Sequence, residues 1–99
     1  MTLFDVILED APATARFRFL TPSIGGADGA ASFSDVAGDM QYLCDRIAIP
    51  ALSRNGWTSG DIVISFSAQA IEFGAFAPEV RQYFQPFSIR DAKCLWEEF

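Results

Sequence analysis

An apolar stripe with helical spacing near the middle of the chain is the feature around which the other elements can be arranged. It lies between Ser34 and Pro50, where apolar residues recur on one side of a helix. Its members are Val36, Met40, Leu43, Cys44 and Ile47. Ser34 or Asp35 can cap the start of the helix, and Pro50 disfavours an α conformation for Ile49. The pattern therefore predicts a helix from Ser34 to Ile49 with one face on a sheet.

Two segments before this helix alternate between apolar and other residues, as half-buried strands do. They are residues 3–9 and 15–20, and residues 10–14 between them predict a turn. If the phenylalanines face the core, the outer face carries the charged side chains of both strands: Asp5, Glu9, Arg16 and Arg18. Opposite charges across a strand pair each stabilise it by about a few tenths of a kcal/mol. We therefore expect a hairpin in this register.

The chain after the helix predicts four more strands and a short second helix. The run of β-branched residues at 61–67 is typical of a buried strand. We expect a helix over Pro78–Gln85, because Pro78 suits a first helical position and Pro86 would end the helix. The expected strands are residues 61–67, 70–74, 87–89 and 94–96.

Together these elements predict a single α+β domain spanning residues 1–99, with the order ββαββαββ. In this two-layer sandwich an antiparallel sheet packs one face on the main helix. Residues 21–33 and 53–60 are expected to be loops. The expected core residues are Phe4, Val6, Phe17, Phe19, Met40, Leu43, Ile47, Ile62, Ile64 and Phe66.

The charge of the chain argues against two classes of partner. Thirteen acidic residues against seven basic ones give a net charge of −6, whereas binding to a phosphate backbone requires clustered Lys and Arg. No apolar run approaches the roughly 20 residues of a membrane span. We therefore expect no direct binding to nucleic acid or membrane. We expect instead that the chain is a monomer or weak homodimer and that its partner is another protein.

The chain contains no histidine. This absence removes Ser–His and Cys–His nucleophile pairs, histidine-ligated metals and the commonest general base at neutral pH. No other constellation of residues in the sequence indicates a specific reaction. We therefore expect a protein that is not an enzyme and that has no catalytic residues, cofactor or metal.

Two features offer an alternative function as a binding domain for a small molecule or cation. The Gly25–Gly29 loop lies between a strand and a helix, as a phosphate cradle does, but it lacks the Gly-Lys-Ser/Thr ending of a P-loop. Asp35 and Asp39 lie four positions apart on the main helix. Two carboxylates at this spacing can bind a cation, although they are more often a solvated helix face near a positive dipole end.

The two cysteines, Cys44 and Cys94, lie 50 positions apart and cannot form a four-thiolate zinc site. Three states are open to them: a disulfide, two buried free thiols, or a reactive nucleophilic thiol. A disulfide that closes this loop would stabilise the chain by about 4 kcal/mol on the loop-entropy estimate. No neighbouring base indicates a depressed thiol pKa, so the nucleophile is the weakest of the three.

Some apolar residues fall outside the predicted core and are candidates for a partner surface. They are Trp57, Phe76, Ile7 and Val63. One interpretation is that loops or the second helix bury them within the monomer. The other is that some remain exposed and anchor a protein partner, since aromatic anchors dominate interface energetics. On this basis the leading function is a small acidic protein that acts through protein contacts, as an inhibitor or adaptor.

Several short pieces resemble an uncharacterised family of small alphaproteobacterial proteins, a domain of unknown function. The pieces are Arg16–Leu20, Asp39-Met40 with Leu43-Cys44, Ile62–Ser65, Glu72–Gly74, Pro78-Glu79 and Cys94–Glu97. The resemblance implies no activity, but many members begin with a secretory signal, and a Cys at both matching positions fits a disulfide. The present sequence lacks such a signal. We therefore expect a cytoplasmic protein if Met1 is the native start, and a periplasmic one if the chain is a truncated mature form.

Overall fold

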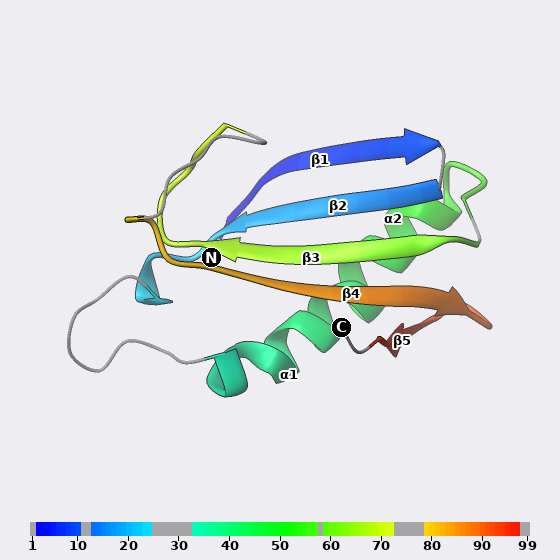
Figure 1. Cartoon of the computed structure of the whole chain (residues 1–99). Coiled ribbons are helices and arrows are strands. Elements are labelled where there is room, and N and C mark those ends of the chain that lie inside the picture. Colours follow the sequence, from blue (N-terminus) through cyan, green and yellow to red (C-terminus); the bar gives the residue numbers. More distant parts are fainter. Residues whose placement is uncertain (1, 11–12, 25–32, 58, 73–78, 98–99) are drawn as a thin grey trace.

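The computed structural model describes residues 2–10, 13–24, 33–57, 59–72 and 79–97. It has an α+β architecture in which one five-stranded sheet is covered on one face by a single long helix (Figure 1). The strands lie in the sheet in their order along the chain. They are β1 (Thr2–Asp10), β2 (Ala13–Leu20), β3 (Asp61–Ser67), β4 (Gln82–Arg90) and β5 (Lys93–Trp96).

The sheet is mixed, so the expected purely antiparallel sheet is wrong at one place. β2 and β3 run parallel, with Phe17 opposite Ile64, whereas the other three neighbouring pairs are antiparallel. The helix connects β2 to β3 across one face of the sheet, and a crossover of this kind is what a parallel pair requires. The strand–helix–strand order in the sequence already carried this signal.

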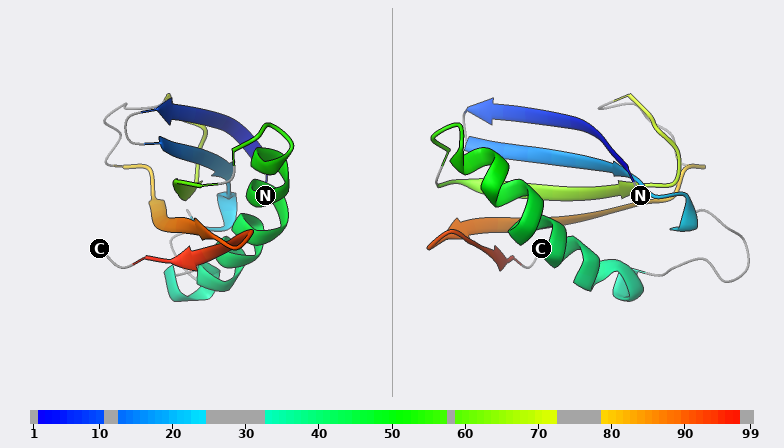
Figure 2. Two further views of the ribbon diagram at one scale, coloured as in Figure 1. Left: turned by 90° about the vertical axis from the view of Figure 1, so that its right-hand side faces the viewer. Right: turned by 180° about the vertical axis from the view of Figure 1, so that it is seen from behind.

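The main helix is continuous from Phe33 to Ser53 and crosses the sheet diagonally (Figure 2). It consists of α1 (Phe33–Leu43), the π-helical segment η2 (Cys44–Ala48) and α2 (Ile49–Ser53). The expected end at Ile49 is therefore wrong. The Ile49 N–H donates to the Cys44 carbonyl five residues earlier, and Pro50 follows at the start of α2. The wider π turn admits Pro50, which has no N–H and would clash with a carbonyl in a regular α turn.

The π segment also changes which residues face the sheet. A π turn contains an extra residue, so the side chains that follow it are rotated relative to a regular helix. Ala48 is consequently buried, whereas Ile47 is 42% exposed, which makes its predicted place in the core wrong. The buried stripe is Val36, Met40, Cys44, Ala48, Ile49 and Leu52.

This shifted stripe predicts opposite outcomes for two substitutions on the same helix. Met40→Ala removes a side chain that is fully buried, so it should lower the free energy of unfolding by about 2–5 kcal/mol. Ile47→Ala removes a side chain that is largely in water and should lower it by less than about 1 kcal/mol. Urea titration of both variants checks the difference. Equal losses would contradict the rotation that the π turn imposes.

Most of the expected core is confirmed. Phe17, Phe19, Met40, Ile62, Ile64 and Phe66 are buried, and Leu43 is half-buried against them. The expected burial of Val6 is wrong, because Val6 lies on β1, where no described residue is buried. Phe4 is only half-buried; the register shifts between Leu3 and Asp5, and the Phe4 ring lies 4.8 Å from the Arg18 guanidinium.

The chain between β3 and β4 departs most from the expected elements. Residues 70–72 form no strand, residues 73–78 lie outside the described part, and Gln82–Gln85 belong to β4 rather than to a helix. Pro86 thus lies inside a strand, opposite Val63. The Pro86 carbonyl accepts a hydrogen bond from the Glu97 N–H, just beyond the end of β5. In an antiparallel pair the N–H and C=O of one residue point to the same neighbour, so the N–H that proline lacks would also have pointed to this place and not to β3. The ladder to β3 is therefore undisturbed.

The final hairpin is confirmed. β4 and β5 pair from Phe87–Trp96 to Arg90–Lys93, and Asp91 and Ala92 form the turn with φ of 52° and 61°. Positive φ at both central residues is the geometry of a type I′ turn, whose twist suits a two-residue hairpin loop.

Candidate protein-binding surface

β1 forms one edge of the sheet, and among the described residues no strand pairs with its outer side (Figure 1). At nine residues it is far longer than the other edge strand, the four-residue β5. Folded proteins usually blunt such edges with short strands, Lys, Pro or bulges, because unpaired backbone groups invite another chain. β1 contains neither Lys nor Pro, and its one register shift, between Leu3 and Asp5, leaves the rest of the strand regular.

Three apolar side chains of β1 face the same side of the sheet as the helix but are not covered by it. The register places Leu3 opposite Phe19, Val6 opposite Phe17 and Leu8 opposite Ala15, all on the core side. Leu3, Val6 and Leu8 are nevertheless 39%, 44% and 55% exposed. The free edge is thus bordered by an apolar strip, which we call the β1 strip.

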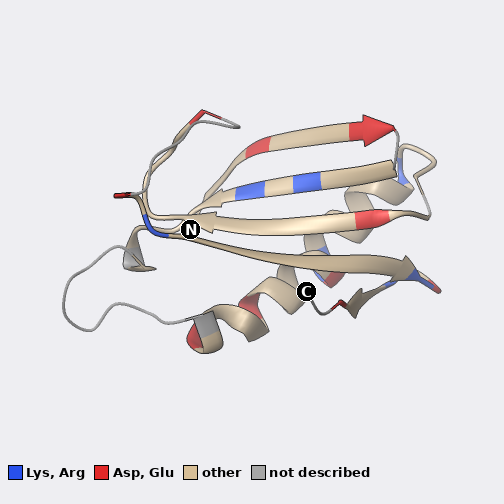
Figure 3. Ribbon diagram, in the orientation of Figure 1, with Lys and Arg blue, Asp and Glu red and all other residues tan. Residues whose placement is uncertain are grey.

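Acidic residues of β1 lie beside arginines of β2 (Figure 3). The register places both on the face opposite the helix. Arg16 Nε lies 2.8 Å from Glu9 Oε1, and Arg18 Nη1 lies 2.9 Å from Asp5 Oδ2. These two ion pairs confirm the expected register of the first hairpin. Arg18 is the more buried partner, with 9% of its side chain exposed against 38% for Asp5. The carboxylates therefore lie on the outer side of their arginines, toward the free edge.

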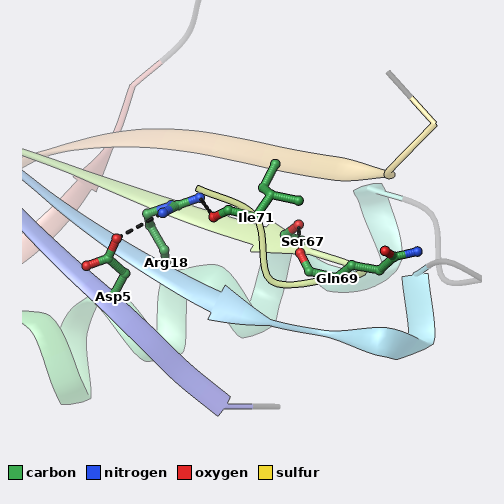
Figure 4. Close-up of polar contacts among 5 residues, drawn as sticks. All are labelled: Asp5, Arg18, Ser67, Gln69 and Ile71. Atoms are coloured by element: carbon green, nitrogen blue, oxygen red, sulfur yellow. Dashed lines mark hydrogen bonds and ion pairs between the residues drawn. The ribbon is translucent and has the colours of Figure 1, made fainter. Parts of the chain in front are cut away.

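Arg18 also anchors the segment that follows β3 (Figure 4). Its Nη2 donates to the Ile71 carbonyl at 2.8 Å, and the Ser67 hydroxyl donates to the Gln69 carbonyl. Figure 4 shows Ile71 and Asp5 on the two sides of the guanidinium. Because a buried arginine needs several acceptors, this arrangement explains how Arg18 is accommodated within the sheet. The cluster is structural, and it fixes Asp5 at the edge.

Trp57 lies half-buried against the core rather than projecting into solvent. The turn before it explains this position. Gly56 has a φ of 76° and donates to the Ser53 carbonyl, and the Trp57 N–H donates to the Leu52 carbonyl. These two bonds form a Schellman motif, which folds the following residue back onto the helix that it ends. The indole Nε1 is buried, so this geometry matches the interpretation that places Trp57 within the monomer.

Two of the other predicted partner residues lie on one face of the sheet, each opposite Arg16. Ile7 and Val63 are half-buried on the face opposite the helix, where Ile7 faces Arg16 and Val63 faces Pro86, and Phe76 lies outside the described residues. A half-open hollow of about 480 Å³ on this face is lined by Val63, Asp61 and Arg16 among others. Two of its charged side chains are already engaged, because Arg16 pairs with Glu9 and Glu97 accepts a hydrogen bond from the Ser88 hydroxyl.

The two cysteines form a disulfide that joins η2 to β5, with their Cα atoms 6.0 Å apart. Of the three states that the sequence left open, the structure has the disulfide, and neither thiol is free. Polar contacts reinforce the link. Asp45 Oδ1 accepts from the Cys94 N–H at 2.8 Å, and Gln41 Nε2 donates to the Cys94 carbonyl at 2.9 Å. β5 is therefore held to the helix as well as to β4.

Of the residues proposed for the alternative function, the structure describes only the two aspartates of the helix. The Gly25–Gly29 loop lies outside the described residues. Asp35 and Asp39 are both exposed on α1, as expected for a solvated helix face. Within the ranges that the structure describes, no group of three or more Cys, Asp or Glu side chains is placed to hold a metal ion.

Comparison with known proteins gives one match. Residues 1–99 match the model of a family of unknown function, DUF6497. The chain belongs to this family. No curated protein and no solved structure gives a significant match. In the part of the chain that the structure describes, no helix is long and apolar enough to cross a membrane.

The β1 strip is the feature that sequence reasoning missed. Alternation along residues 3–9 correctly placed Val6 and Leu8 on the core side, but alternation cannot show how far a covering helix extends. A signal was present in the number of expected strands, which is large for a sheet with one main helix. One helix of about 10 Å diameter covers roughly two strands spaced about 4.8 Å apart, so a five-stranded sheet leaves its edges open.

Proposed function

We propose that this chain is a small acidic protein without enzymatic activity that acts by binding another protein, as an inhibitor or adaptor. One observation carries the proposal: the free nine-residue edge of β1, bordered by the exposed apolar side chains of the β1 strip. Extended segments of other proteins add to open sheet edges of this kind, and backbone hydrogen bonds supply much of the affinity. Binding would cover both the unpaired backbone and the apolar side chains.

Chemical considerations support binding rather than catalysis. The sequence has no histidine, and the two cysteines are engaged in a disulfide. Asp5 and Glu9, the carboxylates nearest the free edge, are paired with arginines. Both carboxylates therefore already have a structural role in holding the first hairpin together.

The test compares two double variants as bait for partner capture from cells of the source organism. Val6→Ser/Leu8→Ser removes two apolar side chains of the β1 strip without adding charge. Phe84→Ser/Leu95→Ser is the matched control, since these residues are 47% and 48% exposed but lie on the opposite face. Unchanged circular dichroism establishes that each variant is folded. We expect a protein bound by the wild type to be retained by the control and reduced at least about ten-fold by the β1 variant.

Two outcomes would contradict the proposal. One is a partner that binds the β1 variant as well as it binds the wild type. The other is a partner lost only from the control variant, which would place the interface on the opposite face.

The disulfide extends the proposal to location. Disulfides persist in oxidising compartments and are rare in a reducing cytosol. Cys44 is fully buried and Cys94 nearly so, which suits a structural bond better than a transient one. We propose that the protein works in an oxidising compartment such as the periplasm rather than in the cytoplasm.

A further inference from the structure

We infer that the segment bound by β1 is an extended strand that alternates apolar and basic residues. This inference rests on the proposed function and specifies the chemistry of the partner. An added strand pairs with the edge and alternates its own side chains between the two faces of the sheet. On the helix side these side chains meet Val6 and Leu8, and on the other side they meet Asp5 and Glu9.

The positions of the charges favour basic residues on that second face. Each carboxylate of β1 lies outside an arginine of β2, and it is the more exposed member of its pair. A Lys or Arg on the added strand would place a second cation on the open side of each carboxylate. The row of charges across the three strands would then alternate in sign, and each opposite-charge pair contributes about 0.2–1 kcal/mol.

The same charges argue against a second copy of this chain as the occupant. In an antiparallel register that pairs the acidic face of β1 with the same face of a second copy, Asp5 and Glu9 lie opposite acids of that copy, either directly or diagonally. Like charges at such positions destabilise strand pairing. Two chains of net charge −6 also repel each other at longer range. The acids of β1 thus disfavour pairing with itself and favour a basic partner.

The probe is a short soluble peptide that alternates Lys and Val, with a Thr/Val peptide and a Glu/Val peptide for comparison. Fluorescence anisotropy measures the affinity of each peptide. Changes in backbone amide NMR signals show which residues of the protein the peptide contacts. We expect the Lys/Val peptide to shift the amide signals of β1. It should bind at least about ten-fold more tightly than the Glu/Val peptide, and more weakly as salt is raised.

Two double variants with equal changes in net charge test whether acids of β1 in particular contribute to binding of the Lys/Val peptide. Glu9→Gln/Asp10→Asn removes two acids at the edge, and Asp35→Asn/Asp39→Asn removes two exposed acids of α1. We expect the first to weaken Lys/Val binding by about three- to ten-fold, and the second by less than about two-fold. Melting curves of both variants check that the fold is intact.

The outcomes separate this inference from the proposed function. Equal binding of the Thr/Val and Lys/Val peptides at β1 would overturn the basic partner and leave the edge as the binding surface. Equal weakening by both double variants would show attraction to net charge alone and would also overturn it. If no peptide shifts the β1 signals, strand addition by a basic segment is excluded. The capture experiment with Val6→Ser/Leu8→Ser then decides the proposed function independently.

Discussion

Replacing both cysteines with alanine will lower the free energy of unfolding by about 4 kcal/mol. The bond closes a loop between residues 50 positions apart, so its loss frees the unfolded chain far more than the folded one. Most single domains are stable by only about 5–15 kcal/mol, so this loss is a large part of the total. Urea titration of Cys44→Ala/Cys94→Ala, beside the oxidised wild type, measures it.

The wild type treated with a thiol reductant is the control for this prediction. It should approach the stability of the double variant, because both then lack the same covalent link. β5 should remain paired with β4 in the folded variant, since Asp45 and Gln41 still bind the backbone of residue 94. A loss below about 1 kcal/mol would contradict a stabilising role for the disulfide.

Phe66→Ala should be comparably severe, with a loss of about 3–5 kcal/mol. Phe66 is fully buried on β3, the central strand, and its ring meets the Phe19 ring edge-on with centroids 6.0 Å apart. Truncation leaves a cavity that the surrounding strands cannot close, because their backbones are fixed by ladders on both sides. Thermal or urea unfolding monitored by circular dichroism measures the effect.

Phe84→Ala is the matched control for this substitution. Phe84 lies on the neighbouring strand β4 and is 47% exposed on the opposite face. Its replacement by Ala removes the same number of atoms as Phe66→Ala. Its replacement should lower stability by less than about 1 kcal/mol. Similar losses for the two variants would mean that the core does not lie between the sheet and the helix.

The sequence was most informative where patterns are local. The first hairpin, its charge pairs, the start of the helix and the final hairpin each depend on one segment of the chain or on two that follow each other directly. The errors arise where contacts with distant parts of the chain, or an irregular turn, decide the conformation or burial of a residue. Pro86 was expected to end a helix, but its missing N–H faces the end of β5, which no local pattern reveals. Ile47 was expected to be buried, but a π turn rotates the helix after Leu43.

The candidate site shows the same division. Trp57 falls in the expected loop of residues 53–60, yet whether that loop folds it inward depends on the Schellman bonds that close the helix. The β1 strip required knowledge of where the helix lies over the sheet, and that placement follows from the parallel crossover between β2 and β3. Alternation identified the face of Val6 but not its exposure.

The free edge of β1 is the centre of this account, and amide hydrogen exchange tests it most directly. The chain is exchanged alone and with the partner obtained by capture, and protection is followed along the sequence. The account predicts that protection rises in residues 2–10, because an added strand bonds to backbone groups that are otherwise open to solvent. β5 and α1 should exchange as they do in the free chain. Protection confined to β4 and β5, with β1 unchanged, would contradict it.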